Sequence, residues 1–160
     1  MRSARELAFR FRQEAANLRL LARPPHIRAE AAPLEGLPDP EQITAAVRGT
    51  AFAEELERLA GSILAHRIPL FGKEVEFGPR IAWRRDWGSG IETGLPYFRL
   101  VPYLDPRRAG DHKRIWELNR HQHLVVLAQA YRLAGRAEYR EELFAQLEDW
   151  WEDNPFQRGI

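Results

Sequence analysis

Hydrophobic residues in the first part of the chain repeat mainly at helical intervals. Residues 4–22 carry apolar side chains every three or four positions, which predicts a helix that ends at a pair of prolines. Residues 24–38 are rich in proline and predict an extended linker. A second helical pattern covers residues 40–66, and Gly49 is a candidate break within it.

The pattern changes after this segment. Polar and apolar residues alternate within 68–83, which predicts a short β-hairpin or irregular strands. Residues 84–109 predict a long loop, and their aromatic content argues against disorder. Two helices follow, over 111–134 and 137–152, with Gly135 between them. Because the connection is so short, we expect these two helices to form an antiparallel hairpin.

This order of elements predicts a mainly α fold in a single helical domain. A chain of 160 residues with 44% hydrophobic and 29% charged residues is typical of one globular domain. We divide it into an N-terminal helix with its linker, a helical segment, short strands with an aromatic loop, and a helical hairpin. These parts are 1–38, 39–67, 68–109 and 110–160.

Charge is distributed unevenly, although the net charge is only +1. Residues 1–28 contain seven arginines and two acids, whereas residues 137–153 contain seven acids and one arginine. Arginine binds carboxylate, sulfate and phosphate through its planar guanidinium, so one interpretation is an anionic partner. The other interpretation is the arginine bias of a GC-rich genome. We interpret the acidic stretch as a solvated helix face.

Composition and motifs exclude several classes of protein. The chain has no cysteine, which excludes disulfides, thiolate metal sites and cysteine nucleophiles. No signal-peptide-like or membrane-spanning segment is visible, so we expect a cytoplasmic location, with the periplasm left open, and no membrane partner. The motifs of zinc proteases, P-loop proteins and α/β-hydrolases are absent, and we expect no metal and no cofactor. Arg10, Arg12 and Arg19 do not form a single stripe, and we expect no nucleic-acid partner.

The helix predicted for 111–134 has the most informative pattern. Its later turns are apolar on nearly all sides, as in a buried helix, yet its first turns are polar. Five side chains of this helix fall on one face within about 120°: Lys113, Trp116, Asn119, Arg120 and His123. Buried polar groups need partners, and the N-terminal end of a helix favours anions. We therefore expect these five residues to line an anion-binding pocket.

A structural interpretation of the same residues stays open. Glu117 is within reach of both Lys113 and Arg120 along the helix, so the cations can be satisfied locally. His123 also fits a core histidine with a hydrogen-bond partner. Three further histidines lie in linker or helix-end positions, where we expect them to be solvated: His26, His66 and His112.

Residues 110–123, GDHKRIWELNRHQH, resemble the GDxKxxWELxRHQH segment of heparinase II/III-type polysaccharide lyases. The resemblance covers nearly the whole chain, and its most specific block is 110–131. Other segments that are similar to the family are 12–19, 23–25, 71–72, 83–86, 146–150 and 154–155.

This resemblance implies the N-terminal portion of an incomplete α/α toroid of helical hairpins, followed in the family by a β-sandwich domain. Members of the family cleave acidic polysaccharides by β-elimination. That reaction needs a neutralised uronate carboxylate, a base for the C5 proton and an acid for the leaving oxygen. In the family these groups lie in later parts of the protein, so we expect the catalytic residues beyond residue 160. The chain would then supply part of the cleft wall.

The sequence also departs from the family pattern. Ala82 stands where many relatives have aspartate beside the tryptophan, and Ala134-Gly135-Arg136 replaces the usual Thr-Gly-Asp. We expect the partners to be an acidic polysaccharide and the missing toroid helices and β-sandwich domain, with self-association through exposed apolar faces. The alternative is a non-catalytic carbohydrate-binding or assembly module. Heparan-type, alginate-type and capsular polymers all remain open as ligands.

Overall fold

The computed structural model describes residues 3–25 and 36–159. The chain divides into two compact units, residues 1–35 and 36–160, and each is described by itself. The boundary falls inside the predicted linker. Most of that linker, together with His26, lies outside the described residues.

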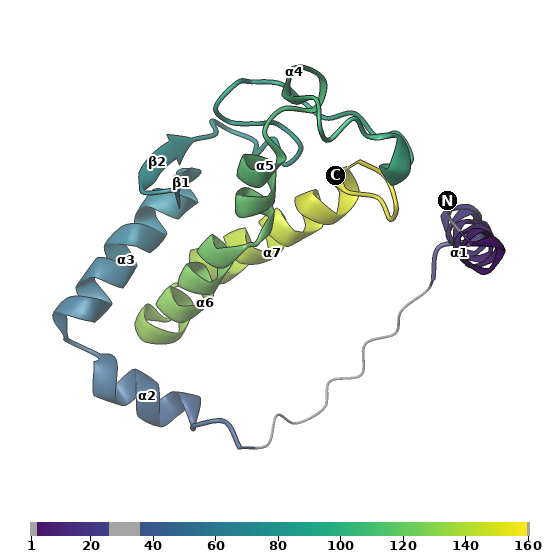
Figure 1. The fold of residues 1–160 in the computed structure, drawn as a ribbon. Helices are drawn as coiled ribbons and strands as arrows, with labels where there is room; N and C mark the ends of the chain where they lie inside the picture. Colours follow the sequence, from purple (N-terminus) through teal and green to yellow (C-terminus); the bar gives the residue numbers. More distant parts are fainter. Residues whose placement is uncertain (1–2, 26–35, 160) are drawn as a thin grey trace. The chain divides into compact units, whose positions relative to one another are not determined.

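The first unit contains the helix α1 (Ala4–Ala22), whose bounds confirm the prediction (purple in Figure 1). The hydroxyl of Ser3 accepts a hydrogen bond from the backbone N–H of Glu6 and so caps the first turn. None of the residues of α1 is buried.

The second unit begins with two helices, α2 (Pro40–Val47) and α3 (Ala51–Leu64). The carboxylate of Asp39 caps α2, and proline occupies the first helical position, where no backbone N–H is needed. Gly49 lies between the helices with a φ of 76°, a conformation that glycine adopts without strain. The break predicted near this glycine is confirmed.

A β-hairpin follows, formed by the antiparallel strands β1 (Arg67–Leu70) and β2 (Lys73–Glu76). Phe71 and Gly72 make the turn, and both have positive φ values, as a tight two-residue turn of this kind needs. Ile68 is fully buried and pairs with Val75 across the hairpin. The predicted hairpin is therefore confirmed, although its strands end at residue 76.

The predicted long loop contains only the short helices η1 (Phe98–Leu100) and α4 (Pro106–Ala109). The hydroxyl of Thr93 donates a hydrogen bond of 2.8 Å to the carbonyl oxygen of the last residue of α4. The backbone N–H of Phe98 donates to the carbonyl oxygen of Gln157, at 3.0 Å. These bonds fix the loop to itself and to the segment that follows the last helix.

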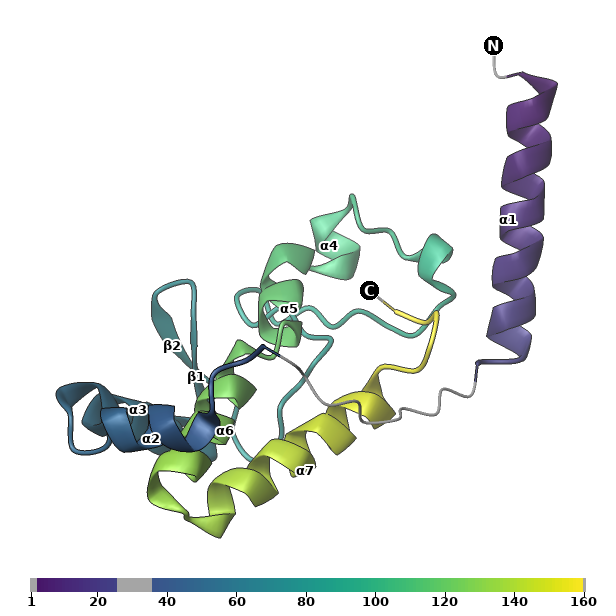
Figure 2. The ribbon, with the colours of Figure 1, turned by 90° about the horizontal axis from the view of Figure 1, so that it is seen from below.

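Three helices complete the unit, namely α5 (His112–Asn119), α6 (Gln122–Ala134) and α7 (Ala137–Asp153). Gly135 ends α6 in the left-handed conformation, and its N–H donates to the carbonyl oxygen of Tyr131. Helix α6 packs against α3 on one side and α7 on the other (Figures 1 and 2). Helices α6 and α7 thus form the predicted helical hairpin.

Two clusters of buried apolar side chains hold the second unit together. The first lies between α3, α6 and α7 and consists of Ala60, Ile63, Leu124, Leu127, Ala130 and Tyr139. The second joins β1, the loop after β2 and α5, and consists of Ile68, Leu70, Ile81, Trp83 and Leu118. Within the described residues the fold is mainly α with one small sheet, as predicted. In the described part of the chain, no helix has both the length and the apolar character to cross a bilayer.

A series of polar contacts connects the hairpin to α6 and α7. The Nδ1 atom of His66 lies 2.7 Å from the carbonyl oxygen of Gly78, and its Nε2 lies 2.9 Å from Oε1 of Glu142. Gln146 donates to the same carboxylate oxygen, and its own Oε1 lies 2.9 Å from Nε2 of His123. The prediction that His66 and Glu142 are solvated is wrong, because each finds its partner on a distant element.

His66 also has an unusual backbone conformation, with a φ of 52°. We expect His66→Ala to destabilise the protein by about 1 kcal/mol more than His66→Gly. Both variants lose the contacts of the histidine side chain, but only alanine has a Cβ atom that makes a positive φ unfavourable. Urea unfolding of the two variants and the unchanged protein measures the difference. Equal stabilities for the alanine and glycine variants would contradict the positive φ.

Candidate functional site

The chain leaves the helical path at the centre of the segment predicted as one helix over 111–134. That prediction is wrong, because α5 ends at Asn119 and α6 begins at Gln122. His121, between them, has a φ of 57° and a ψ of 25°, which is the left-handed conformation. For a residue other than glycine this conformation costs about 1–3 kcal/mol, and it persists only where surrounding contacts impose it.

Aromatic rings supply those contacts for His121. Its ring lies edge-on to Trp150, with 4.7 Å between the centroids, and edge-on to Trp83, at 5.7 Å. The Nε2 atom of His121 is buried and has no hydrogen-bond partner among the described residues. Burial lowers the pKa of His121, which favours the neutral ring.

The five predicted site residues fall into two groups, and only His123 lies beyond the break. Lys113 and Trp116 of α5 and Arg120, the residue that follows its last turn, are exposed, and at 100° per residue they lie within about 60° of one another. We call these three residues the α5 face. Asn119 is half-buried and His123 is buried, and the side chains of both are engaged in contacts inside the protein. The structure therefore brings together three of the five at the surface.

Trp116 is the aromatic centre of the α5 face, and its side chain is 51% exposed. The ring of His112 lies 4.8 Å from it, edge-on, and that histidine is half-buried rather than solvated as predicted. Arg120 forms an ion pair of 3.0 Å with Glu117, which is the local pair that the sequence allowed. The backbone N–H of Lys113 donates to the capping carboxylate of Asp111, while its ammonium group is exposed.

Asn119 holds three parts of the fold together. Its side-chain NH₂ donates to the carbonyl oxygens of Ile115 and Trp83, at 2.7 and 2.8 Å. Its side-chain oxygen accepts a hydrogen bond of 2.7 Å from the indole N–H of Trp150. This one amide therefore ties α5 to the loop after the hairpin and to α7.

His123 lies in the core beside Trp83. Its ring is stacked on the indole with 6.1 Å between the centroids, and its Nε2 donates to the amide oxygen of Gln146. Burial lowers the pKa of His123 to about 4, so the ring is neutral near pH 7. These contacts are those of a core histidine with a satisfied hydrogen bond, the structural alternative.

Trp83 is the residue on which these contacts converge, and the sequence pattern singled it out only within the family resemblance. Its side chain is fully buried, and its indole N–H donates to the carboxylate of Asp149 at 2.8 Å. Arg80 forms ion pairs with Asp149 and Asp153, at 2.9 and 3.2 Å. The prediction that the acidic residues of α7 form a solvated face is wrong for these two aspartates, because the loop after the hairpin packs on them.

Asp86 organises the aromatic loop and was not predicted as a key residue. Its buried carboxylate accepts hydrogen bonds from the hydroxyl of Ser89 and from the backbone N–H groups of Gly88 and Asp111. Arg114 adds an ion pair at 3.3 Å. Burial alone would raise the pKa of Asp86, but these hydrogen bonds outweigh it and lower the pKa to about 2.

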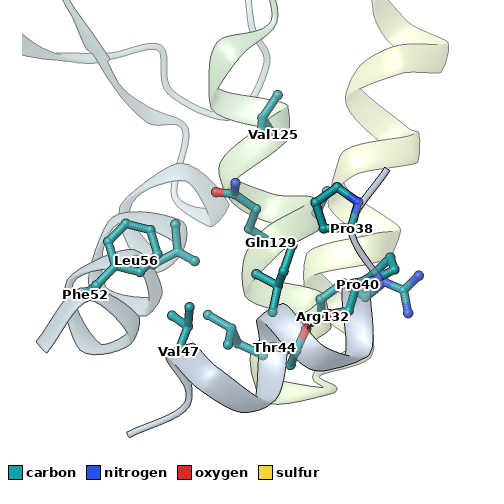
Figure 3. Close-up of a pocket in the computed structure, with 12 residues that line it drawn as sticks. Pro38, Pro40, Thr44, Val47, Phe52, Leu56, Val125, Gln129 and Arg132 are labelled. Carbon is teal, nitrogen blue, oxygen red and sulfur yellow. Dashed lines mark hydrogen bonds between the residues drawn. The ribbon is translucent and has the colours of Figure 1, made fainter. Parts of the chain in front are cut away.

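A separate apolar pocket of about 290 Å³ lies between α2, α3 and α6 (Figure 3). Figure 3 shows apolar side chains such as Phe52, Leu56 and Val125 around it. The guanidinium of Arg132, at its edge, is paired with Glu41 at 3.0 Å. An acidic sugar needs several cations and amides, so this pocket does not suit one. The described part of the chain contains no group of three potential metal ligands.

The family model described as the heparinase II/III N-terminus matches the sequence over residues 64–159, which is more than half of the chain. The chain belongs to the heparinase II/III family. The matched region of the family runs from the end of α3 through α7 and includes His121 and the whole α5 face. The similar segments 12–19 and 23–25 lie outside it. No curated protein and no solved structure matches the chain. Family membership relates the function of the chain to that of polysaccharide lyases.

The low pKa of Asp86 predicts how stability depends on pH. The Asp86 carboxyl takes up its proton near pH 3.8 in the unfolded chain and only near pH 2 in the folded protein. The ionised carboxylate therefore adds to the free energy of unfolding above about pH 4, and this contribution is lost as the pH falls to about 2. We expect this contribution to be about 2 kcal/mol. Urea unfolding between pH 2 and 7 measures the free energy of unfolding of the unchanged protein and of Asp86→Asn. The unchanged protein should lose about 2 kcal/mol more than the variant as the pH falls. Parallel pH profiles for the two proteins would contradict the hydrogen-bonded carboxylate.

Proposed function

We propose that this chain forms part of a polysaccharide lyase and that its α5 face contributes to the wall of a cleft for an acidic, uronate-containing polymer. The observation that carries this proposal is the exposure of Trp116 between Lys113 and Arg120, inside the region matched to the family. An aromatic ring offers a flat apolar surface to the C–H groups of a sugar ring. The two cations bind its carboxylate or sulfate groups.

The inward-facing residues have a supporting part in this proposal. Asn119 fixes the end of α5 to Trp83 and Trp150, and His123 fixes the start of α6 to Gln146. These contacts form a rigid frame below the α5 face and hold its three side chains in place before the polymer binds. Less side-chain freedom is then lost on binding, which reduces the entropic cost.

The chemical step places further demands on the enzyme. β-Elimination at a uronate needs a group that neutralises the carboxylate, a base that removes the C5 proton and an acid that protonates the glycosidic oxygen. We assign none of these roles to the residues of this chain. In this proposal the chain binds and orients the polymer as part of an α/α toroid, and the catalytic groups come from later parts of the enzyme.

Matched substitutions on exposed side chains test the α5 face. We expect Trp116→Ala and Arg120→Gln each to raise the Kd for a uronate polymer such as alginate or heparin by about tenfold, because each removes a direct contact. Affinity electrophoresis of the full chain with the polymer in the gel measures the effect.

The chain offers a close control for each variant. Arg132 is paired with a glutamate at 3.0 Å and is 57% exposed, against 3.0 Å and 63% for Arg120. Trp151 is 74% exposed on another helix and serves as the control for Trp116. We expect Arg132→Gln and Trp151→Ala to leave the Kd unchanged. If all four folded variants bind as the unchanged chain does, the α5 face has no part in polymer binding.

A further inference from the structure

Three arginines of α1 repeat every seven residues. Arg5, Arg12 and Arg19 are all exposed, and at 100° per residue they lie within about 40° of one another around the helix axis. Successive members are about 10.5 Å apart along the axis, so the three span about 21 Å. We call these three residues the arginine row. Figure 2 shows α1 along its length.

The arginine row differs from the remaining arginine within α1 in its charge environment. Arg10 lies on another side of the helix, about 160° from Arg12, and pairs with Glu6 at 3.1 Å. In the described part of the chain, no hydrogen bond or ion pair engages the guanidinium groups of the arginine row. Three guanidinium groups in line therefore face solvent, and no acid among residues 3–25 and 36–159 pairs with them.

Exposed apolar side chains border the arginine row on both sides. Phe11, 76% exposed, lies on one side with Leu7 and Leu18, and Phe9, 65% exposed, lies on the other with Leu20. Glu14 falls between Leu7 and Leu21 on the wider apolar side. A carboxylate at that position opposes insertion of this side into an anionic lipid surface.

We propose that the arginine row is a second binding surface for an acidic polysaccharide, in addition to the α5 face. This inference rests on the proposed function, since both surfaces take the same class of polymer. The guanidinium groups are too far apart to share one small anion, and their linear spacing suits charges that recur along an extended chain. The guanidinium fork binds carboxylate and sulfate groups in the same way, and the flanking phenylalanines offer apolar surface to the sugar rings.

Two neighbouring arginines make a matched test. Arg12→Gln and Arg10→Gln remove the same charge from the same helix turn, but only Arg12 belongs to the arginine row. Glutamine is a good helix former, so α1 stays intact, and circular dichroism verifies this. We expect Arg12→Gln to weaken the binding of the full chain to alginate or heparin at least threefold, and Arg10→Gln to leave it unchanged.

Combining the three substitutions extends the test. We expect Arg5→Gln/Arg12→Gln/Arg19→Gln to weaken binding at least tenfold and to reduce its dependence on salt concentration, because fewer counterions are released on binding. Alginate carries carboxylates alone and heparin carries sulfates as well, so the two polymers identify the anion that the row prefers.

Three results would overturn the inference. Equal losses in Arg10→Gln and Arg12→Gln would indicate an effect of net charge. The unchanged chain could also bind single-stranded DNA or phosphatidylglycerol vesicles more tightly than either polymer. If that binding is lost in the triple variant, the arginine row belongs to another partner. Polymer binding that falls in Trp116→Ala but not in the triple variant would remove the arginine row and leave the proposed function standing. If the unchanged chain binds neither polymer, both proposals fail.

Discussion

The left-handed backbone of His121 is the constraint on which the rest of the second unit depends. Its ring lies edge-on to Trp150 and Trp83, and these contacts hold a conformation that is costly for any residue but glycine. The bend separates α5 from α6, so that the two helices point their side chains in different directions. His123, after the bend, is buried and contacts Gln146, whereas Trp116, before it, stays at the surface.

The run of polar residues in 113–123 therefore serves two purposes in one short segment. Its inward members bind Trp83 and Gln146 and fix the frame, which the buried carboxylate of Asp86 extends into the aromatic loop. Its outward members form the α5 face, where two cations flank an aromatic ring. Placing a binding surface on a rigid frame of this kind is how proteins limit the cost of ordering side chains on binding.

Local pattern predicted the elements that depend on local chemistry. The break at Gly49 and the short connection at Gly135 each follow from one residue type in one place. The bend at His121 could not be predicted in this way, because no glycine or proline marks it and its aromatic partners lie 38 residues before it and 29 residues after it. The same applies to His66, whose partner Glu142 lies on α7, and to His123, whose partner Gln146 lies on the same helix.

The bend at His121 can be observed directly in the backbone conformation of residues 111–134 in solution. NMR chemical shifts of the full chain report helix, and the sign of φ, residue by residue. We expect helical shifts over His112–Asn119 and Gln122–Ala134, interrupted by a positive φ at His121. Uninterrupted helical shifts from His112 to Ala134 would contradict the bend, because a straight helix would place His123 on the same face as Trp116.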